Sequence, residues 1–146
     1  VHFHDNIFTD NKTTAIAVAS YVLIYEMGKR NKSSSETSSE KVVGSTRTIN
    51  DKYLSDKNYN PYPRKITIGE NTFTNSHTFP TINNDFGKIL LLKKPFSTVD
   101  VLWDGVEDPN SAYTICFTNK EVSFYGLDVL NDFKNATDDV SKYMCE

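Results

Sequence analysis

The sequence lacks several features that mark metal sites and membrane proteins. It has only two cysteines, Cys116 and Cys145, and they do not form a CxxC pair, so they cannot build a zinc site without histidines. No apolar run approaches the roughly 20 residues that a membrane-spanning helix needs. His2 and His4 share one face of a terminal strand, but no third ligand accompanies them. We therefore expect neither a metal, nor a cofactor, nor a membrane span.

Excess positive charge is also missing. The formal net charge of −3 argues against a nucleic-acid binder that relies on general basicity, because such affinity comes largely from neutralised phosphates. Hydrophobic residues make up 38% of the chain, which excludes a mostly disordered protein. Its 146 residues fit one domain, 1–146.

The chain begins at Val1, without an initiator methionine and without a signal peptide. This start predicts a mature or trimmed product and leaves secretion open. In a secreted protein, Cys116 and Cys145 could be bridged or could each lack a partner, and the sequence favours neither. Sequons at Asn11, Asn31 and Asn135 are weak hints of a secretory route.

The clearest local pattern lies in Tyr62–Ile82. Two strand-like runs, Lys65–Ile68 and Thr72–Phe79, flank a Gly-Glu-Asn break, and alternation bounded by Gly, Pro and Asn is typical of paired strands. Proline removes a ladder donor, so Pro63 and Pro80 should stand at strand ends. The pattern predicts an antiparallel hairpin.

The rest of the chain predicts one helix, several strands and a long loop. An apolar run with a capping residue before it and Gly28 after it predicts a buried helix over Thr13–Met27. A Ser-, Glu- and Lys-rich segment predicts a polar loop at about 32–58. Further strands are expected at Ile89–Leu92, Thr98–Trp103, Ala112–Phe117 and Glu121–Leu130. The expected fold is α+β, with the N-terminal helix packed on one face of a twisted antiparallel sheet.

This order of elements resembles the small fungal guanyl-specific ribonucleases. The stretches that correspond to that family's motifs are Tyr62-Pro63-Arg64 and Thr78-Phe79-Pro80. The chain is also similar to the RNase-like effectors secreted by powdery mildew fungi, through YPRKITIGENTFTNSHTFPTI and AYTICFTNKEVSFYGLDVL. It departs from them in having His4 where they carry a cysteine and in the length of residues 32–58. The resemblance implies a microbial ribonuclease-like fold.

The resemblance also implies that catalysis has been lost. The positions of the family's catalytic His, Glu and Arg are taken by Arg64, Thr78 and Tyr113, and its last His falls near Leu127 or Asp128. A guanidinium stays protonated and cannot act as a base, and a threonine hydroxyl has no suitable pKa. We therefore expect a pseudo-ribonuclease and not an enzyme.

The resemblance implies a secreted virulence or avirulence effector that reaches the host cell cytoplasm and binds host plant proteins, including an NLR-type immune receptor. Surface loops, residues 32–58 among them, and the open face of the sheet would make these contacts. One alternative is an RNA-binding module without cleavage, and its candidate RNA or partner contacts are Tyr62, Arg64, Lys65, Lys93 and Lys94. Another is a ribonuclease with rearranged catalytic residues, namely His77, Glu70 and Arg64.

Overall fold

The computed structural model describes residues 1–23 and 56–146. Its eight strands pair in parallel and form three small sheets. The first sheet has the order β1 (His2–Phe3), β4 (Ile66–Ile68), β7 (Ile115–Phe117). The second consists of β2 (Ile7–Thr9) and β5 (Thr72–Thr74). The third has the order β3 (Thr14–Val18), β6 (Val99–Trp103), β8 (Phe124–Gly126).

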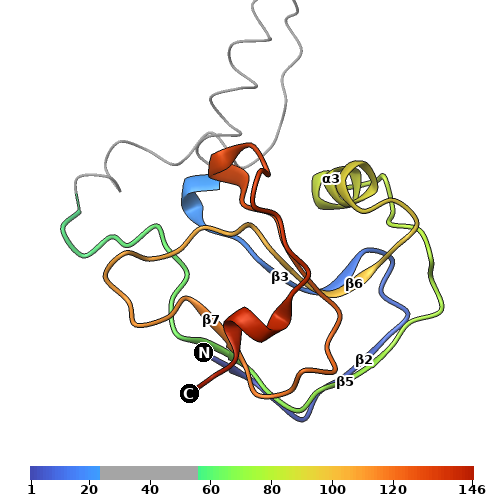
Figure 1. Cartoon of the computed structure of the whole chain (residues 1–146), viewed down its shortest axis with the longest axis horizontal. Coiled ribbons are helices and arrows are strands. Elements are labelled where there is room, and N and C mark those ends of the chain that lie inside the picture. Colours follow the sequence, from blue (N-terminus) through green and yellow to red (C-terminus); the bar gives the residue numbers. More distant parts are fainter. Residues whose placement is uncertain (24–55) are drawn as a thin grey trace, which may run out of the picture.

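This strand order describes a chain that winds in coils, as a parallel β-helix does. Residues 1–18 form the first coil and residues 66–103 the second, each passing through all three sheets in turn. Residues 115–126 form the third coil, with strands in the first and third sheets. Figure 1 looks along the stack, so β2 runs along β5 and β3 along β6.

The corners of the first coil follow from the conformational tolerance of aspartate. Asp5, between β1 and β2, has a φ of 58°, and Asp10, between β2 and β3, has a φ of 51°. Aspartate and asparagine enter this left-handed region at lower cost than most residues, because their short side chains bond to nearby backbone. Two such corners bend three short strands into one turn of the coil.

The interior is built from side chains stacked in columns, because the parallel register places one coil's inward residues over those of the next. Phe3 is aligned with Ile68, and Ile68 with Phe117. In the second sheet the rings of Phe8 and Phe73 stack, with centroids 5.2 Å apart and planes inclined by 9°. The main buried cluster contains Ile16, Val18, Ile68, Val101, Trp103, Ile115, Phe117 and Phe124.

The second coil carries an insertion. Four residues join β2 to β3, whereas twenty-four join β5 to β6, and these include α3 (Asp85–Lys93). Leu90 of α3 is fully buried in a second cluster with Leu102 of β6 and Leu127. In Figure 1 this helix lies outside the coil, next to β6. The third sheet is therefore covered on both faces, which explains why four of the five residues of β6 are buried.

The ends of α3 are defined by capping. Asn84 Oδ1 accepts a hydrogen bond from Gly87 N at 2.7 Å, and Asp85 and Lys93 place charges that suit the helix dipole. Two short 3-10 helices follow the third coil, η2 (Val129–Asn131) and η3 (Val140–Tyr143). They carry the chain back to β7, where Cys145 is bonded to Cys116.

The expected antiparallel α+β fold is wrong, and with it the ribonuclease-like sheet. The runs around Gly-Glu-Asn do form strands, β4 and β5, but these pair with β1 and β2 of the first coil instead of with each other. Alternation of apolar and polar residues indicates that a segment is a strand, but it does not indicate which strand it pairs with. The Gly-Glu-Asn break is a corner of the coil rather than a hairpin turn.

Two further predictions of local structure are wrong. Within the predicted helix Thr13–Met27, residues Thr14–Val18 form strand β3, and of the described residues only 21–23 are helical. The predicted strand Ile89–Leu92 lies inside α3. Both are short apolar runs whose state is decided by tertiary partners. Residues 24–55, which include most of the predicted 32–58 loop, lie outside the described part of the chain.

Candidate ligand site

The candidate site lies where the second coil leaves the third sheet after Trp103 and the C-terminal segment returns over the third coil. Cys145 N donates to Phe117 O at 2.9 Å, and the Cys116–Cys145 disulfide fixes the same point covalently. Farther back, Gly126 and Thr137 exchange two backbone hydrogen bonds of 2.8 and 2.9 Å. The C-terminal segment is therefore held at both ends against the third coil.

Two neighbouring hollows open between this segment and the loop after β6. Their volumes are about 530 Å³ and 300 Å³, within the lower part of the range for small-molecule pockets. Trp103, Glu107 and Tyr143 line both. Since the same three side chains form the wall between the hollows, we treat the two as one site.

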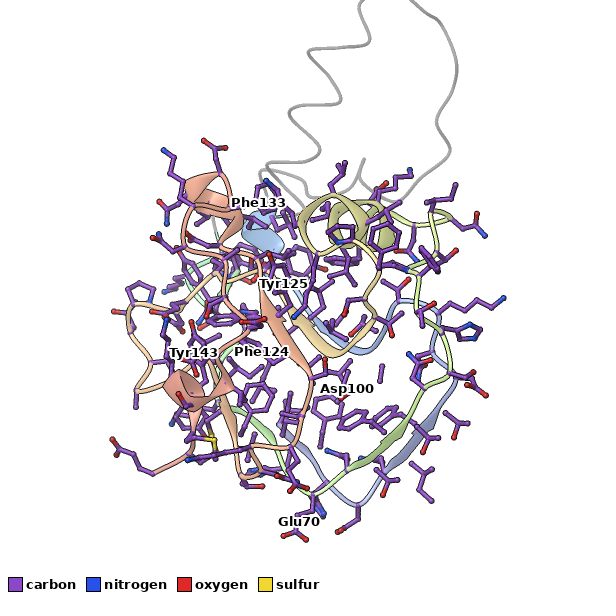
Figure 2. All side chains as sticks on the ribbon, turned by 45° about the vertical axis from the view of Figure 1, so that its right-hand side comes forward. Glu70, Asp100, Phe124, Tyr125, Phe133 and Tyr143 are labelled. Atoms are coloured by element: carbon purple, nitrogen blue, oxygen red, sulfur yellow. A yellow bond between two sulfur atoms is a disulfide. The ribbon has the colours of Figure 1, made fainter. Side chains whose placement is uncertain are left out.

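Trp103 supplies the unusual feature of this site. The residue is 1% exposed, and its Nε1 is buried without a hydrogen-bond partner among the described residues. The Tyr143 ring meets the Trp103 ring edge to face, with centroids 5.3 Å apart, and it meets the Phe124 ring at 5.4 Å. Figure 2 shows Tyr143 and Phe124 close together beside η3. Leaving a buried donor unpaired costs about 1–3 kcal/mol, so an acceptor that reached this indole would recover that energy.

The Tyr143 hydroxyl can donate a hydrogen bond because it stays protonated. Burial raises the pKa of its hydroxyl, and the nearby carboxylates of Glu107, Asp128 and Asp139 raise the pKa further. The hydroxyl therefore keeps its proton well above neutral pH. Carboxylates outnumber the one basic side chain, Lys142, among the residues that line the two hollows, so the surroundings are unfavourable for an anionic ligand.

The Asp128 carboxylate is held in place by three hydrogen bonds that it accepts. Its Oδ1 accepts from Asn131 Nδ2 at 2.7 Å, and its Oδ2 accepts from the backbone and side-chain nitrogens of Asn135 at 3.1 and 2.8 Å. Its φ of 54° lies in the left-handed region. A Cβ on the neighbouring Gly105 would come within 2.5 Å of Asp128 N. This wall of the smaller hollow is therefore preorganised.

The loop that carries Glu107 is anchored by a buried carboxylate. Asp104 is 0% exposed and accepts hydrogen bonds from Ser20 N at 2.6 Å and Val106 N at 3.0 Å. Burial raises the pKa of Asp104, and the hydrogen bonds from Ser20 and Val106 only partly oppose that effect. Asp104 thus joins the end of the first coil to the start of the site loop.

The residues expected at the vestigial ribonuclease site do not form one group. Arg64 and Tyr113 lie on neighbouring coils, as the 3.2 Å bond from Lys65 N to Tyr113 O indicates. Tyr113 lines the larger hollow, and its hydroxyl is 3.3 Å from Thr67 Oγ1. Thr78 belongs to the insertion between β5 and α3, which Figure 1 shows across the coil from the segments that carry Arg64 and Tyr113.

The expected RNA or partner contacts are divided between two regions. Arg64 and Lys65 precede β4, whereas Lys93 and Lys94 stand at the end of α3. Lys94 Nζ lies 3.0 Å from Asp138 Oδ2 and over the Tyr125 ring, and Lys93 Nζ lies over the Phe133 ring. Tyr62 is half-buried against the cluster under α3. These five residues do not make a continuous basic face.

The histidines and Glu70 are scattered as well. His4 Nδ1 lies 2.7 Å from Asp5 Oδ2 on the exposed first corner, and Glu70 sits at the corresponding corner of the second coil. His77 lies in the insertion, where its carbonyl accepts from Thr98 Oγ1 at 2.9 Å. Residues 1–23 and 56–146 contain no group of three or more His, Cys, Asp or Glu side chains that could hold a metal. Within the same residues no helix is both long and apolar enough to cross a bilayer.

Sequence reasoning missed Trp103, Glu107 and Tyr143 as site residues. The signal that could have led to them is an internal repeat, because Asn6-Ile-Phe-Thr9 recurs as Asn71-Thr-Phe-Thr74. That repeat marks corresponding corners of two coils and would have indicated a solenoid. The site itself depends on the return of the C-terminal segment, and local sequence gives no sign of that return.

Comparison with known proteins assigns no family. No family model matches the chain, no curated protein matches it, and no solved structure matches it.

Proposed function

We propose that this protein is a binding module whose C-terminal site takes a neutral, hydroxyl-bearing small molecule of about monosaccharide size. The buried Trp103 Nε1–H without a partner carries this proposal. A hydroxyl group can accept from the indole and at the same time donate to the Glu107 carboxylate. A protonated amine or a bare metal cation cannot accept from the indole, and an inorganic anion is repelled by the surrounding carboxylates.

The shape of the site supports the same chemistry. The half-buried ring of Tyr143 offers apolar surface for the C–H groups of such a molecule, while Glu107 and the Tyr143 hydroxyl offer polar contacts. Asp128, being bonded to Asn131 and Asn135, acts as a rigid wall and not as a free acid or base. The proposal is therefore one of binding without catalysis.

The effector function stays a prediction. It was implied by a ribonuclease-like fold, and the coiled architecture removes that support without bearing on secretion, host proteins or an immune receptor. RNA binding also stays a prediction, and its candidate Lys93 and Lys94 are engaged with Phe133, Tyr125 and Asp138.

The chain contains one tryptophan, so its fluorescence reports on this site directly. We expect neutral monosaccharides and polyols to change the emission of Trp103 saturably. For a ligand of about 12 heavy atoms at ~0.3 kcal/mol per atom, a Kd on the order of 1 mM is expected. Sulfate, which has no donor near neutral pH, and calcium, which has no acceptor, are the probes that lack the required pair, and phosphate at the same concentration tests the exclusion of anions.

Two variants test the contacts. Tyr143→Phe should weaken binding by roughly 2- to 10-fold and Glu107→Gln by roughly 10-fold or more, since bonds to charged groups are the stronger ones. Glu121→Gln, at an exposed carboxylate outside both hollows, is the matched control and should bind as the wild type does. A sugar and polyol panel that leaves the emission unchanged would sink the proposal, as would equal affinity of all three variants.

A further inference from the structure

The two ends of the coil stack differ. At the C-terminal end, Met144 is bridged to Phe117 and Thr137 to Gly126, so part of the last coil's edge is covered by the chain itself. At the other end, the first coil has no described segment on its outer edge. An uncovered strand edge presents unpaired backbone donors and acceptors that can pair with another strand.

The contact between the first two coils shows what such an edge accepts. Thr67 N donates to Val1 O at 2.8 Å, Gly69 N to Phe3 O at 2.7 Å, and Thr72 N to Asn6 O at 2.8 Å. In register, these three donors correspond to His2, His4 and Ile7 of the first coil.

Because backbone groups alternate in direction along a strand, the N–H groups of His2, His4 and Ile7 face away from the second coil. None of these N–H groups has a partner within residues 1–23 and 56–146. All three residues are exposed, and the apolar Ile7 is 78% exposed. These three N–H groups can therefore donate hydrogen bonds to the strands of a further coil.

The side chains of the corner asparagines, Asn6 and Asn71, also form hydrogen bonds between the first and second coils. Asn71 Oδ1 accepts from Asn6 Nδ2 at 3.0 Å and from Asn6 N at 3.1 Å, and Asn71 Nδ2 donates back to Phe3 O at 3.0 Å. Asn6 Oδ1, the corresponding acceptor one coil earlier, has no partner in the described part of the chain. Beside it, one face of the Phe8 ring stacks on Phe73.

We propose that the outer edge of the first coil binds a strand–corner–strand segment of another polypeptide, in parallel and in register. The segment carries asparagine at the corner, to bond Asn6 Oδ1, and an aromatic residue two positions later, to stack on Phe8. This contact continues the interface already present between the first and second coils. A second copy of the chain fits less well, because two identical first-coil edges related by a two-fold axis meet antiparallel and lose the asparagine register.

The partner's chemistry can be tested with a peptide that copies the second coil, residues 65–76, KITIGENTFTNS. Fluorescence anisotropy of the labelled peptide should show saturable binding with a Kd on the order of 0.1–1 mM. Replacing the peptide's asparagine at the Asn71 position by alanine should weaken binding by about 5-fold or more, since the side-chain hydrogen bond to Asn6 Oδ1 is lost. A scrambled peptide is the control for composition.

Backbone methylation distinguishes strand pairing from unspecific adhesion. In the proposed register, the peptide N–H at the Phe73 position faces the protein and the N–H at the Thr72 position faces away. N-methylation at the Phe73 position should abolish binding, whereas N-methylation at the Thr72 position should leave it within about 2-fold. On the protein side, Ile7→Pro removes an outward N–H that makes no bond within the described stack and should also abolish binding. Circular dichroism and thermal unfolding verify that this variant remains folded.

Equal binding of the scrambled peptide, or equal effects of the two methylations, would overturn the proposal. So would absence of binding up to about 5 mM, a concentration well above the expected Kd. Self-association of the chain that Ile7→Pro abolishes, in the absence of peptide binding, would replace the separate polypeptide by a second copy and would likewise overturn it.

Discussion

Asn6 and Asn71 occupy the same corner in successive coils, and the Asn6 side chain donates to Asn71 Oδ1 at 3.0 Å. The main-chain N–H of Asn6 donates to the same oxygen at 3.1 Å. Two residues 65 positions apart thereby fix the register of the first and second coils. A one-residue slip would turn every inward side chain outward, so this pair protects the stacking of Phe8 on Phe73.

Asn71→Ala should destabilise the fold. The substitution removes the acceptor of both Asn6 bonds and the donor of the bonds to Phe3 O and Gly69 O. We expect a loss of about 1–3 kcal/mol in the free energy of unfolding, measured by urea titration followed by circular dichroism. The control is Asn83→Ala, at an exposed side chain, which should change the free energy by less than about 0.5 kcal/mol. Equal effects of the two substitutions would contradict the stabilising role of the Asn6–Asn71 hydrogen bonds.

The fold could be predicted only in part from the sequence. Strands at Val99–Trp103 and Ile115–Phe117 lie within the segments predicted for them, because alternation of β-branched and aromatic residues is a local signal. Pairing is not local. Thr72–Thr74 pairs with residues 65 positions earlier rather than with the adjacent strand, and only the recurring Asn-x-Phe-Thr pattern carries that information.

The site was harder to predict than the strands. Tyr113 was singled out for a ribonuclease role and lines the larger hollow, yet the residues that define both hollows come from three separate segments. Trp103 ends β6, Glu107 lies in the following loop and Tyr143 ends η3. The return of the C-terminal segment brings them together, and that return depends on the disulfide and the Phe117–Met144 bridge.

Asp104→Ala should destabilise the protein in a pH-dependent way. It leaves the buried N–H groups of Ser20 and Val106 without an acceptor, at a cost of about 2–4 kcal/mol. The folded-state pKa of Asp104 is raised above its ordinary value by burial, so its stabilising contribution is fully present below the unfolded pKa. That contribution is lost as pH rises through the folded pKa. The difference between variant and wild type should therefore be largest in acid.

Asp10→Ala is the control for this pH dependence. Hydrogen bonds from the Ser76 side chain and backbone lower the pKa of Asp10. Its contribution is therefore present above the unfolded pKa and lost as pH falls through the folded pKa, which is the opposite trend. Urea titrations at a series of pH values on both sides of the ordinary aspartate pKa, about 3.9, measure both series. Parallel trends in the two variants would contradict the assignment of Asp104.

Cys145→Ser should loosen the C-terminal segment and separate Tyr143 from the other residues of the candidate site. The disulfide closes a loop with a sequence separation of 29, and loop-closure entropy predicts a stabilisation of roughly 3–4 kcal/mol. We expect the melting temperature to fall and the fluorescence of Trp103 to shift to longer wavelength, because Tyr143 would no longer cover the indole. Dithiothreitol should reproduce both changes in the wild type and neither in the variant.

Gly87→Ala should destabilise the fold although alanine is the better helix former. Within α3, replacing glycine by alanine favours the helix by about 1 kcal/mol. A Cβ at this position, however, would clash with Thr81 O, a backbone atom whose residue is held by the hydrogen bond from Thr81 N to Lys12 O at 3.0 Å. The helix would have to move away from the Thr81 backbone, so we expect a net loss of about 2 kcal/mol or more, measured by urea titration. Lys88→Ala, an exposed position in the same helix, should stay within about 0.5 kcal/mol of the wild type. A stabilising Gly87→Ala would show that α3 is not packed this closely against the Thr81 backbone.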